Sequence, residues 1–181
     1  GLAEGLPATI DLELQGEIGE SDPSLAKLSF LKGLLGNIGG DPVSYVNAAR
    51  LAEQRSLDVR VITTPGEKGR SNLIRVTGDV HSLAGSLSPI DGNPRLNEVD
   101  GHRLDIRPSD DMLIVRNHDI PGMVGIVGTM VGDAGVNISN MYIGEDADGV
   151  AAMMVISTDG LVPNNVQQAI RAVDGVQSVR A

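Results

Sequence analysis

The chain opens on a stretch, residues 8–15, in which apolar and polar side chains alternate. Alternation of this kind is typical of a strand with one buried face. A helix is predicted next, because Asp22 can cap its N-terminus and Pro23 suits its first position. Leucines then recur at helical spacing until Gly39–Gly40, where we expect this helix to end.

The following part of the pattern predicts a second helix and a series of strands. The helix is expected from about residue 43 to residue 55, with Val46, Ala49 and Ala52 on its buried stripe. The strands are expected at residues 57–63, at 72–80 and, in shorter pieces, from 81 to 107.

From about residue 109 the pattern predicts the order βαββαβ. The four strands are expected at 112–116, 136–143, 150–157 and 176–179, and the helices open at Pro121 and Pro163. In this split arrangement two helices cover one face of a four-stranded antiparallel sheet, and the other face needs a partner, water or a ligand.

The polar segment Pro108–Asp111 interrupts the pattern and predicts a domain boundary there. We therefore expect two domains, residues 1–108 and residues 109–181. The fold class is α+β, with an N-terminal α/β domain followed by a ferredoxin-like βαββαβ domain that has an antiparallel sheet.

Composition narrows the classes of protein. Hydrophobic residues make up 41% of the 181 residues and aromatic residues only 2%, so the cores must be aliphatic. The net charge of −10 argues against nucleic acid and anionic membranes as partners. No apolar run reaches the ~18 residues that span a bilayer, and we expect a cytoplasmic protein. An RNA-recognition fold shares the βαββαβ order but needs aromatic residues on its sheet, and the second domain offers only Tyr142.

Residues for catalysis or for a metal are not predicted. The chain has no cysteine, and its histidines, His81, His102 and His118, are isolated in the sequence and expected at the surface. No glycine-rich dinucleotide motif follows a strand. The acidic segment 144–149 lacks the ligand pattern of a calcium loop and is expected to be a hairpin turn.

The predicted helix after Pro121 contains Gly125, Gly128 and Gly132 on roughly one face. Each costs about 1 kcal/mol of helix stability relative to alanine. We expect this cost to be offset by tight packing of the glycine face on the sheet.

One group of residues suits a small zwitterion. Asn117, Asp119, Pro121 and Gly122 lie between a strand and a helix N-terminus, where free backbone N–H groups bind carboxylates. Asp119 can pair with an ammonium group, and the amides of Asn117 and Asn137 can both donate and accept hydrogen bonds. Each residue alone also has a structural explanation, but their combination favours a binding site.

The segments Asn117–Val124 and Gly135–Ile138 resemble the ACT domain, an amino-acid-sensing module, in the version that ends bacterial D-3-phosphoglycerate dehydrogenases. Ser44–Ala48, Gly69–Ser71 and Asp100–Arg107 resemble the intervening, allosteric substrate-binding domain of the long form of these enzymes. The resemblance covers nearly the whole chain from about residue 8.

The resemblance implies binding of L-serine, the feedback inhibitor of serine synthesis in that family, between paired ACT domains. Asn117 and Asp119 would come from one chain and Asn137 from its neighbour in a homodimer. The resemblance also implies a basic anion site in the intervening domain, for phosphate or a phosphorylated acid, at Arg95 and Arg107. A further basic residue that some members contribute falls near Ser157, which is not basic.

The resemblance further implies a longer parent enzyme, a tetramer that oxidises 3-phosphoglycerate with NAD. The catalytic residues and the NAD site of that family have no counterpart here, so we predict that this fragment holds no cofactor and is inactive alone. Two alternatives stay open. In the first, the chain is the regulatory domain pair of an L-serine dehydratase. In the second, it is a dimerisation module without an effector.

Overall fold

The computed structural model of the chain describes residues 6–20, 22–36, 42–65, 72–145 and 151–181. By packing, the chain divides into a first unit, Leu2–Gly92, and a second unit, Asn93–Ala181. This division comes earlier than the boundary predicted between residues 108 and 109, because the strands before residue 107 pack within the second unit. The division by packing does not test where one sequence domain ends and the next begins, so the boundary between residues 108 and 109 stays a prediction. The segments Gly39–Gly40, Gly69–Ser71 and 146–149 lie outside the described residues.

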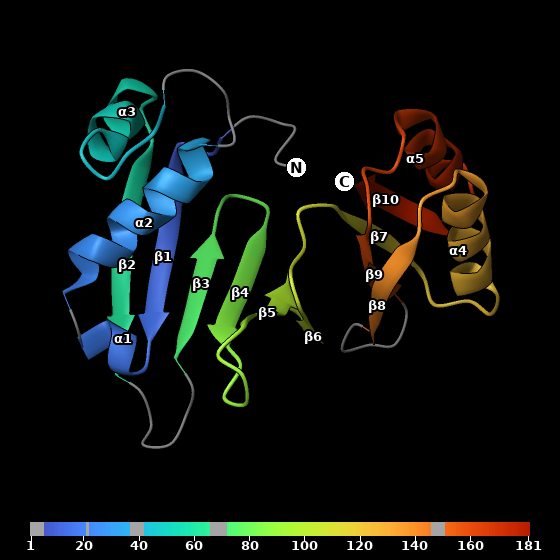
Figure 1. Ribbon diagram of the computed structural model, residues 1–181, viewed down its shortest axis with the longest axis horizontal. Helices are drawn as coiled ribbons and strands as arrows, with labels where there is room; N and C mark the ends of the chain where they lie inside the picture. The colour runs from blue at the N-terminus through green and yellow to red at the C-terminus, as the bar shows by residue number, and fades with distance from the viewer. Residues whose placement is uncertain (1–5, 21, 37–41, 66–71, 146–150) are drawn as a thin grey trace. The chain divides into compact units, whose positions relative to one another are not determined.

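The first unit contains a sheet with the strand order β2-β1-β3-β4. Strand β1 pairs in parallel with β2 and antiparallel with β3, which forms a hairpin with β4. A parallel pair needs a long crossover, and the helices between β1 and β2 supply it (Figure 1). The strands are β1 (Thr9–Gln15), β2 (Asp58–Thr64), β3 (Leu73–Thr77) and β4 (Ser82–Leu87).

The helices of the first unit lie against β1 and β2 and bury one side of these strands (Figure 1). Ile10, Leu12 and Leu14 alternate along β1 and are buried, as the sequence pattern predicts. Leu31 and Leu35 of α2 pack against them. The helices are α1 (Glu17–Glu20), α2 (Pro23–Gly36) and α3 (Ala48–Gln54).

Helix α3 is shorter than predicted, because it begins at Ala48 rather than near residue 43. The backbone N–H of Ser44 donates to Asn47 Oδ1 (2.7 Å), and this local bond holds the preceding residues in a turn. The predicted stripe is wrong at Val46, which is 93% exposed, and at Ala49, which is also exposed; only Ala52 is buried as predicted. The buried residues of α3 are Ala48, Leu51 and Ala52.

Asp22 caps helix α2 as predicted, and its charge gives a test of the first unit. The backbone N–H of Ser24 donates to Asp22 Oδ1 (2.9 Å), and this bond lowers the pKa of Asp22 below its ordinary value. A lowered folded-state pKa stabilises the fold above the unfolded-state pKa, and this stabilisation disappears as the pH falls through the folded-state pKa. We expect Asp22→Ala to lower the melting temperature at neutral pH and to approach wild type in acid.

The control for this prediction is Asp22→Asn, which keeps a capping acceptor without the titrating charge. It should melt between wild type and Asp22→Ala at neutral pH, because it keeps the hydrogen bond and loses the charge. A melting-temperature difference between Asp22→Ala and wild type that stays constant down to strongly acidic pH would contradict the assignment of the cap to the ionised carboxylate.

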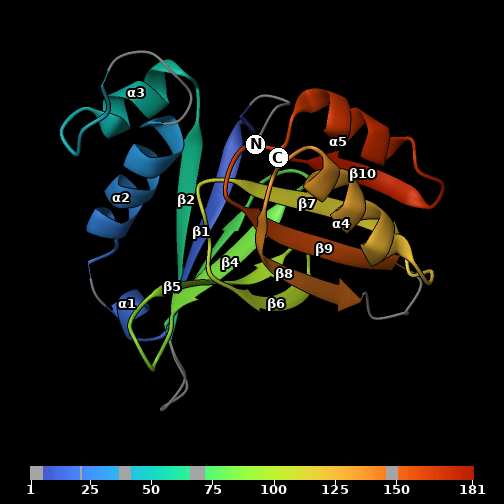
Figure 2. The same ribbon diagram turned by 45° about the vertical axis from the view of Figure 1, so that its right-hand side comes forward.

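The second unit contains a four-stranded sheet in the order β10-β7-β9-β8, in which every pair is antiparallel. Two helices lie on one side of this sheet (Figure 2), so the predicted ferredoxin-like βαββαβ arrangement is confirmed. No helix in the described ranges is long and apolar enough to cross a membrane. The elements are β7 (Met112–His118), α4 (Met123–Asp133), β8 (Ile138–Glu145), β9 (Ala151–Thr158), α5 (Asn164–Arg171) and β10 (Val176–Arg180).

A hairpin of the same unit, β5 (Pro94–Val99) and β6 (His102–Ile106), covers part of the other face of this sheet. Its two-residue turn has positive φ at Asp100 and Gly101, as a type I′ turn requires. A Cβ added at Gly144 of β8 would lie 3.3 Å from the carbonyl oxygen of Arg103. The residues of this apolar layer are Leu96, Val99, Leu104, Ile106, Met112, Ile114, Tyr142, Met153 and Val155.

The glycines of α4 do not face the sheet, which corrects the sequence-based prediction. A Cβ added at Gly125, Gly128 or Gly132 would meet nothing within 4 Å. The sheet instead receives Met123, Val127 and Val131, which are buried. The apolar spacing of α4 has two candidate stripes, and the larger side chains take the core. The glycine side of α4 is therefore open in the single chain.

Candidate functional site

Strand β7 and the loop that follows it carry four of the five predicted effector residues. Alternation along β7 places Asn117 on the same face as Leu113 and Val115, and only 2% of Asn117 is exposed. Its Nδ2 donates to the carbonyl oxygen of His118 (2.7 Å). Its Oδ1 is buried and has no hydrogen-bond partner within the described part of the chain. An unsatisfied buried acceptor costs about 1–3 kcal/mol, so a donor from outside the chain would be favoured there.

The N-terminus of α4 lies directly after this loop. Gly122, the N-cap, has φ +91°, a left-handed conformation that favours glycine, and it offers no side-chain cap. Its carbonyl oxygen accepts from Ile126 (3.0 Å), but the N–H groups of Val124 and Gly125 have no partner among the described residues. Free N–H groups at the positive end of a helix dipole favour a bound carboxylate.

Asp119 lies in the loop between these two features and is exposed. Its carboxylate forms no hydrogen bond or ion pair with any described residue, so the fold does not need it as a cap. Pro121, also exposed, follows two residues later and restricts the backbone before Gly122. An acceptor, a carboxylate and two free donors therefore lie within one short segment, which is what a zwitterion requires.

Asn137 lies beyond the other end of α4, after Gly135 (φ +76°). Its backbone N–H donates to Asp159 Oδ1 (2.9 Å), and its carbonyl oxygen accepts from the N–H of Asp159 (3.1 Å). These bonds fix the start of β8. The side chain of Asn137 is exposed and has no partner in the ranges that the structure describes.

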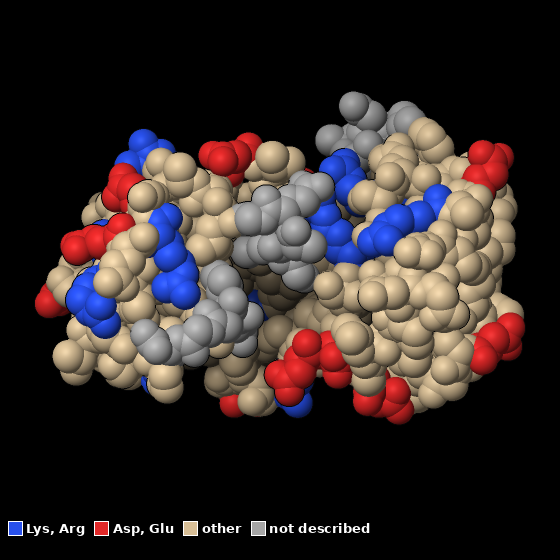
Figure 3. All heavy atoms as spheres, turned by 90° about the horizontal axis from the view of Figure 1, so that it is seen from above, with Lys and Arg blue, Asp and Glu red and all other residues tan. Residues whose placement is uncertain are grey.

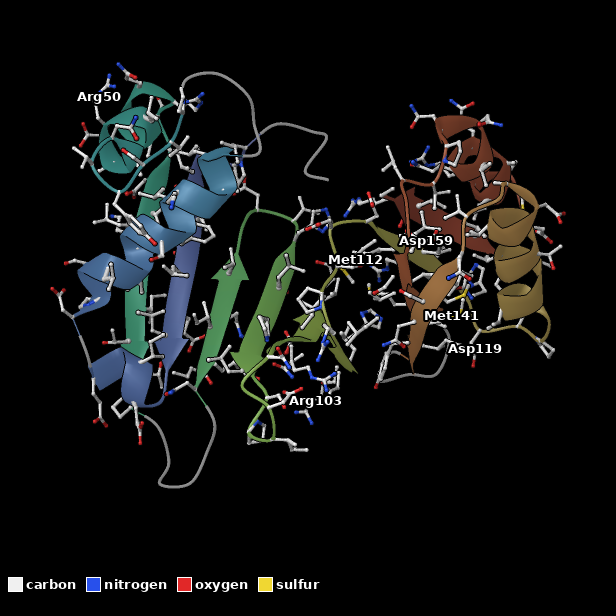
Figure 4. The ribbon with its side chains drawn as sticks, in the orientation of Figure 1. Arg50, Arg103, Met112, Asp119, Met141 and Asp159 are labelled. Atoms are coloured by element: carbon white, nitrogen blue, oxygen red, sulfur yellow. The ribbon has the colours of Figure 1, made fainter. Side chains whose placement is uncertain are left out.

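One copy of the chain does not bring Asn137 to the loop. Asn117 pairs with Ala152 and Ile138 with Thr158, at opposite ends of β9, which corresponds to about 20 Å along the strand. In Figure 4, Asp119 and Asp159, the residue that bonds Asn137, lie apart from each other. The predicted site is therefore divided between the two ends of α4.

The two predicted anion residues, Arg95 and Arg107, occupy neighbouring backbone positions in the second unit. Leu96 pairs with Ile106 in the β5–β6 hairpin, so the two arginines follow that pair at the open end of the hairpin. Arg95 Nε lies 3.7 Å from Asp105 Oδ1. Blue basic side chains gather on part of the face seen from above (Figure 3). Two cations at one end of a hairpin repel each other unless an anion or an acid lies nearby.

Three further buried polar atoms of the second unit lack a hydrogen-bond partner in the described part of the chain: His102 Nε2, Arg116 Nε and Ser157 Oγ. Sequence reasoning expected His102 at the surface, but it is 7% exposed, since it is the first residue of β6 and lies against Gly144 of β8. Alternation along β7 could have placed Arg116 on the face of Met112 and Ile114. The alternation of residues does not indicate that the β5–β6 hairpin covers this face of the sheet.

Comparison with protein families gives two matches. The description "D-3-phosphoglycerate dehydrogenase intervening domain" matches residues 2–100, and the description "ACT domain" matches residues 112–175. The first match ends within the β5–β6 hairpin, and the second contains every residue of the predicted effector site.

Curated relatives match nearly the whole chain. D-3-phosphoglycerate dehydrogenase of Mycobacterium leprae is 32% identical over 176 residues, which are 94% of this chain and 33% of the relative. The Methanocaldococcus jannaschii enzyme of that name is 31% identical over 180 residues, 97% of this chain and 34% of the relative. The chain thus spans about a third of the length of these relatives. Among solved structures, the ACT domain of GTP pyrophosphokinase from Chlorobium tepidum covers 40% of this chain and 97% of its own, with 18% identity and a TM-score of 0.31.

Proposed function

The chain belongs to the D-3-phosphoglycerate dehydrogenase family, of which it contains the intervening and ACT domains, and from this premise we propose that it binds L-serine as a feedback effector between two copies. It is a regulatory region of that family. The observation that carries the proposal is the buried, unpartnered Oδ1 of Asn117 beside a free helix N-terminus.

L-serine matches the groups that the loop offers. Its carboxylate would accept from the N–H groups of Val124 and Gly125, and its ammonium group would pair with Asp119. Asn117 Oδ1 supplies an acceptor for the ammonium or hydroxyl protons. The carboxylate and the ammonium group of the amino acid then each face a protein group of opposite charge or dipole. Both can be desolvated without a large cost in binding free energy.

A second copy would supply Asn137. If two α4 helices pack antiparallel across a two-fold axis, the start of one lies beside the end of the other, and Asn137 reaches the loop of its neighbour. The open glycine side of α4 permits close approach of such a helix. Strand β8 is an edge of its sheet, and Val124, Ile126 and Ile143 are exposed on α4 and β8. Sheet pairing along β8 would bury them.

Calorimetry with the dimeric chain tests the proposal. We expect heat of binding with L-serine at micromolar to millimolar concentration, and much weaker binding of D-serine, whose groups cannot all meet the same partners. L-alanine, which lacks the hydroxyl, should bind more weakly than L-serine. If no heat of binding is measured with L-serine at millimolar concentration, the proposal that L-serine is the effector is wrong, and the chain is a dimerisation module.

A second proposal is an anion site at Arg95 and Arg107, for phosphate or a phosphorylated acid. Both arginines lie next to the Leu96–Ile106 pair at the open end of the hairpin, and this favours the site because guanidinium groups bind phosphate oxygens well. We expect Arg107→Gln to weaken phosphate binding about tenfold, or ~1.4 kcal/mol. Arg103→Gln is the control, since Arg103 lies on β6 near the hairpin turn, at the other end of the strand from Arg107 (Figure 4). Equal losses in both variants would indicate unspecific charge attraction.

The reaction of the longer protein is a proposal as well. We propose that the parent, a tetramer, oxidises 3-phosphoglycerate with NAD, and that this chain alone produces no NADH from 3-phosphoglycerate. The sequence upstream in the parent gene decides between this enzyme and an L-serine dehydratase. A dinucleotide-binding fold there supports the dehydrogenase.

A further inference from the structure

We propose that Gly175, in the turn between α5 and β10, is a positioning residue for the effector loop, Asn117–Met123. This inference rests on the proposed binding of L-serine at that loop. Gly175 offers no group to a ligand, and the sequence-based site does not include it. Its role would be to let the α5–β10 turn lie directly against the loop and fix the loop backbone.

Backbone hydrogen bonds join the turn to the loop. The N–H of His118 donates to the carbonyl oxygen of Gly175 (2.8 Å), and the next residue, Val176, pairs with Asn117. Within the loop, the N–H of Ile120 donates to the carbonyl oxygen of His118 (2.9 Å). The amide of Asn117 donates to that same oxygen. The position of the His118 peptide therefore determines where Asn117 and Asp119 lie.

Only glycine permits this arrangement without a shift. Gly175 has φ +88°, and a Cβ added there would lie 3.1 Å from Ile120 Cδ1 and 3.2 Å from Met123 Cε. These distances are shorter than ordinary van der Waals contact. Met123 is buried in the core and has little room to move, whereas Ile120 is 45% exposed and can move outward. A side chain at position 175 would therefore strain the left-handed backbone of the turn and displace the ends of Ile120 and Met123 by a few tenths of an ångström, which disturbs the contact between the turn and the loop.

The turn itself is firmly held, so the loop is the part that must yield. Arg171 of α5 donates from Nε (3.2 Å) and Nη2 (2.6 Å) to the carbonyl oxygen of Val179 in β10. Val173 and Val176 pack against the helix-side core of the second unit. The α5–β10 turn is thus a fixed surface against which the effector loop packs.

The test compares Gly175→Ala with Gly101→Ala in the whole chain. Gly101 also has a left-handed φ (+83°), but a Cβ there would meet nothing within 4 Å. Both variants should lose stability through backbone strain. Only Gly175→Ala should bind L-serine more weakly, about tenfold, and only it should speed hydrogen exchange at the His118 amide. Ile120→Ala, added to Gly175→Ala, removes the closest contact and should recover part of the affinity.

The outcomes separate this inference from the proposed function. If wild type binds L-serine and Gly175→Ala binds it equally well, the positioning role is wrong. If wild type does not bind L-serine, the proposed function fails, and the exchange measurement alone decides whether Gly175 fixes the loop. Unchanged exchange of the His118 amide in Gly175→Ala would then overturn the inference.

Discussion

Asp119→Asn should weaken L-serine binding about 100-fold, because it removes the charge that pairs with the ammonium group, a loss of about 2–3 kcal/mol. The free energy of unfolding should stay near that of wild type. The carboxylate of Asp119 is exposed and forms no bond with the residues that the structure describes, so the fold loses nothing with it. Calorimetry measures the affinity, and urea unfolding measures the stability.

Asp79→Asn is the matched control, because it makes the same change of charge at an exposed position in the first unit. It should leave L-serine affinity unchanged. If the two variants bind L-serine equally well, the ammonium group does not pair with Asp119, and the assignment of ligand groups to the loop fails.

Gly128→Leu should abolish the dimer and L-serine binding together while it stabilises the isolated helix. A leucine on the open side of α4 prevents a second helix from approaching, so the neighbour can no longer supply Asn137. Within one chain the change favours α4, because leucine gains about 0.8–1 kcal/mol of helix propensity over glycine and a Cβ at this position meets nothing. Sedimentation measures the assembly, and calorimetry measures the binding.

Gly33→Leu is the control for this prediction. Gly33 lies on α2, and a Cβ there also meets nothing within 4 Å. This variant should keep both the dimer and the L-serine affinity. A Gly128→Leu chain that still dimerises and binds L-serine would show that two copies do not meet along α4.

Hydrophobic periodicity predicted the helices and strands wherever one face of the element is buried and the other is exposed to solvent. Strand β1 and the βαββαβ order of the second unit follow from it. It was wrong for the start of α3, because the bond from the Ser44 N–H to Asn47 Oδ1 holds residues 44–47 as a separate turn before the helix begins at Ala48. For α4 the expectation that the glycine face packs on the sheet was wrong, because Met123, Val127 and Val131 take that side of the helix.

The residues of the candidate site could be predicted from the sequence, but their burial and their contacts could not. Asn117, Asp119 and Gly122 are close in the sequence, and a strand followed by a helix N-terminus brings them together. The 98% burial of Asn117 and its unpartnered Oδ1 depend on the neighbouring strands β9 and β10, which no local pattern specifies. The contact of Gly175 with the loop is equally non-local, since more than fifty residues separate them in the chain.

The central claim is that each L-serine site combines the loop of one copy with Asn137 of the other, and mixing two inactive variants tests it most directly. Asp119→Ala and Asn137→Ala should each lose L-serine binding as pure dimers. In a mixed dimer of the two, one site carries both changes and the other carries neither. After unfolding and refolding together, the mixture should recover about one quarter of the wild-type number of sites per chain, at wild-type affinity, since about half of the dimers are mixed. No recovery of binding in a mixture shown to contain mixed dimers would contradict a site shared between two chains.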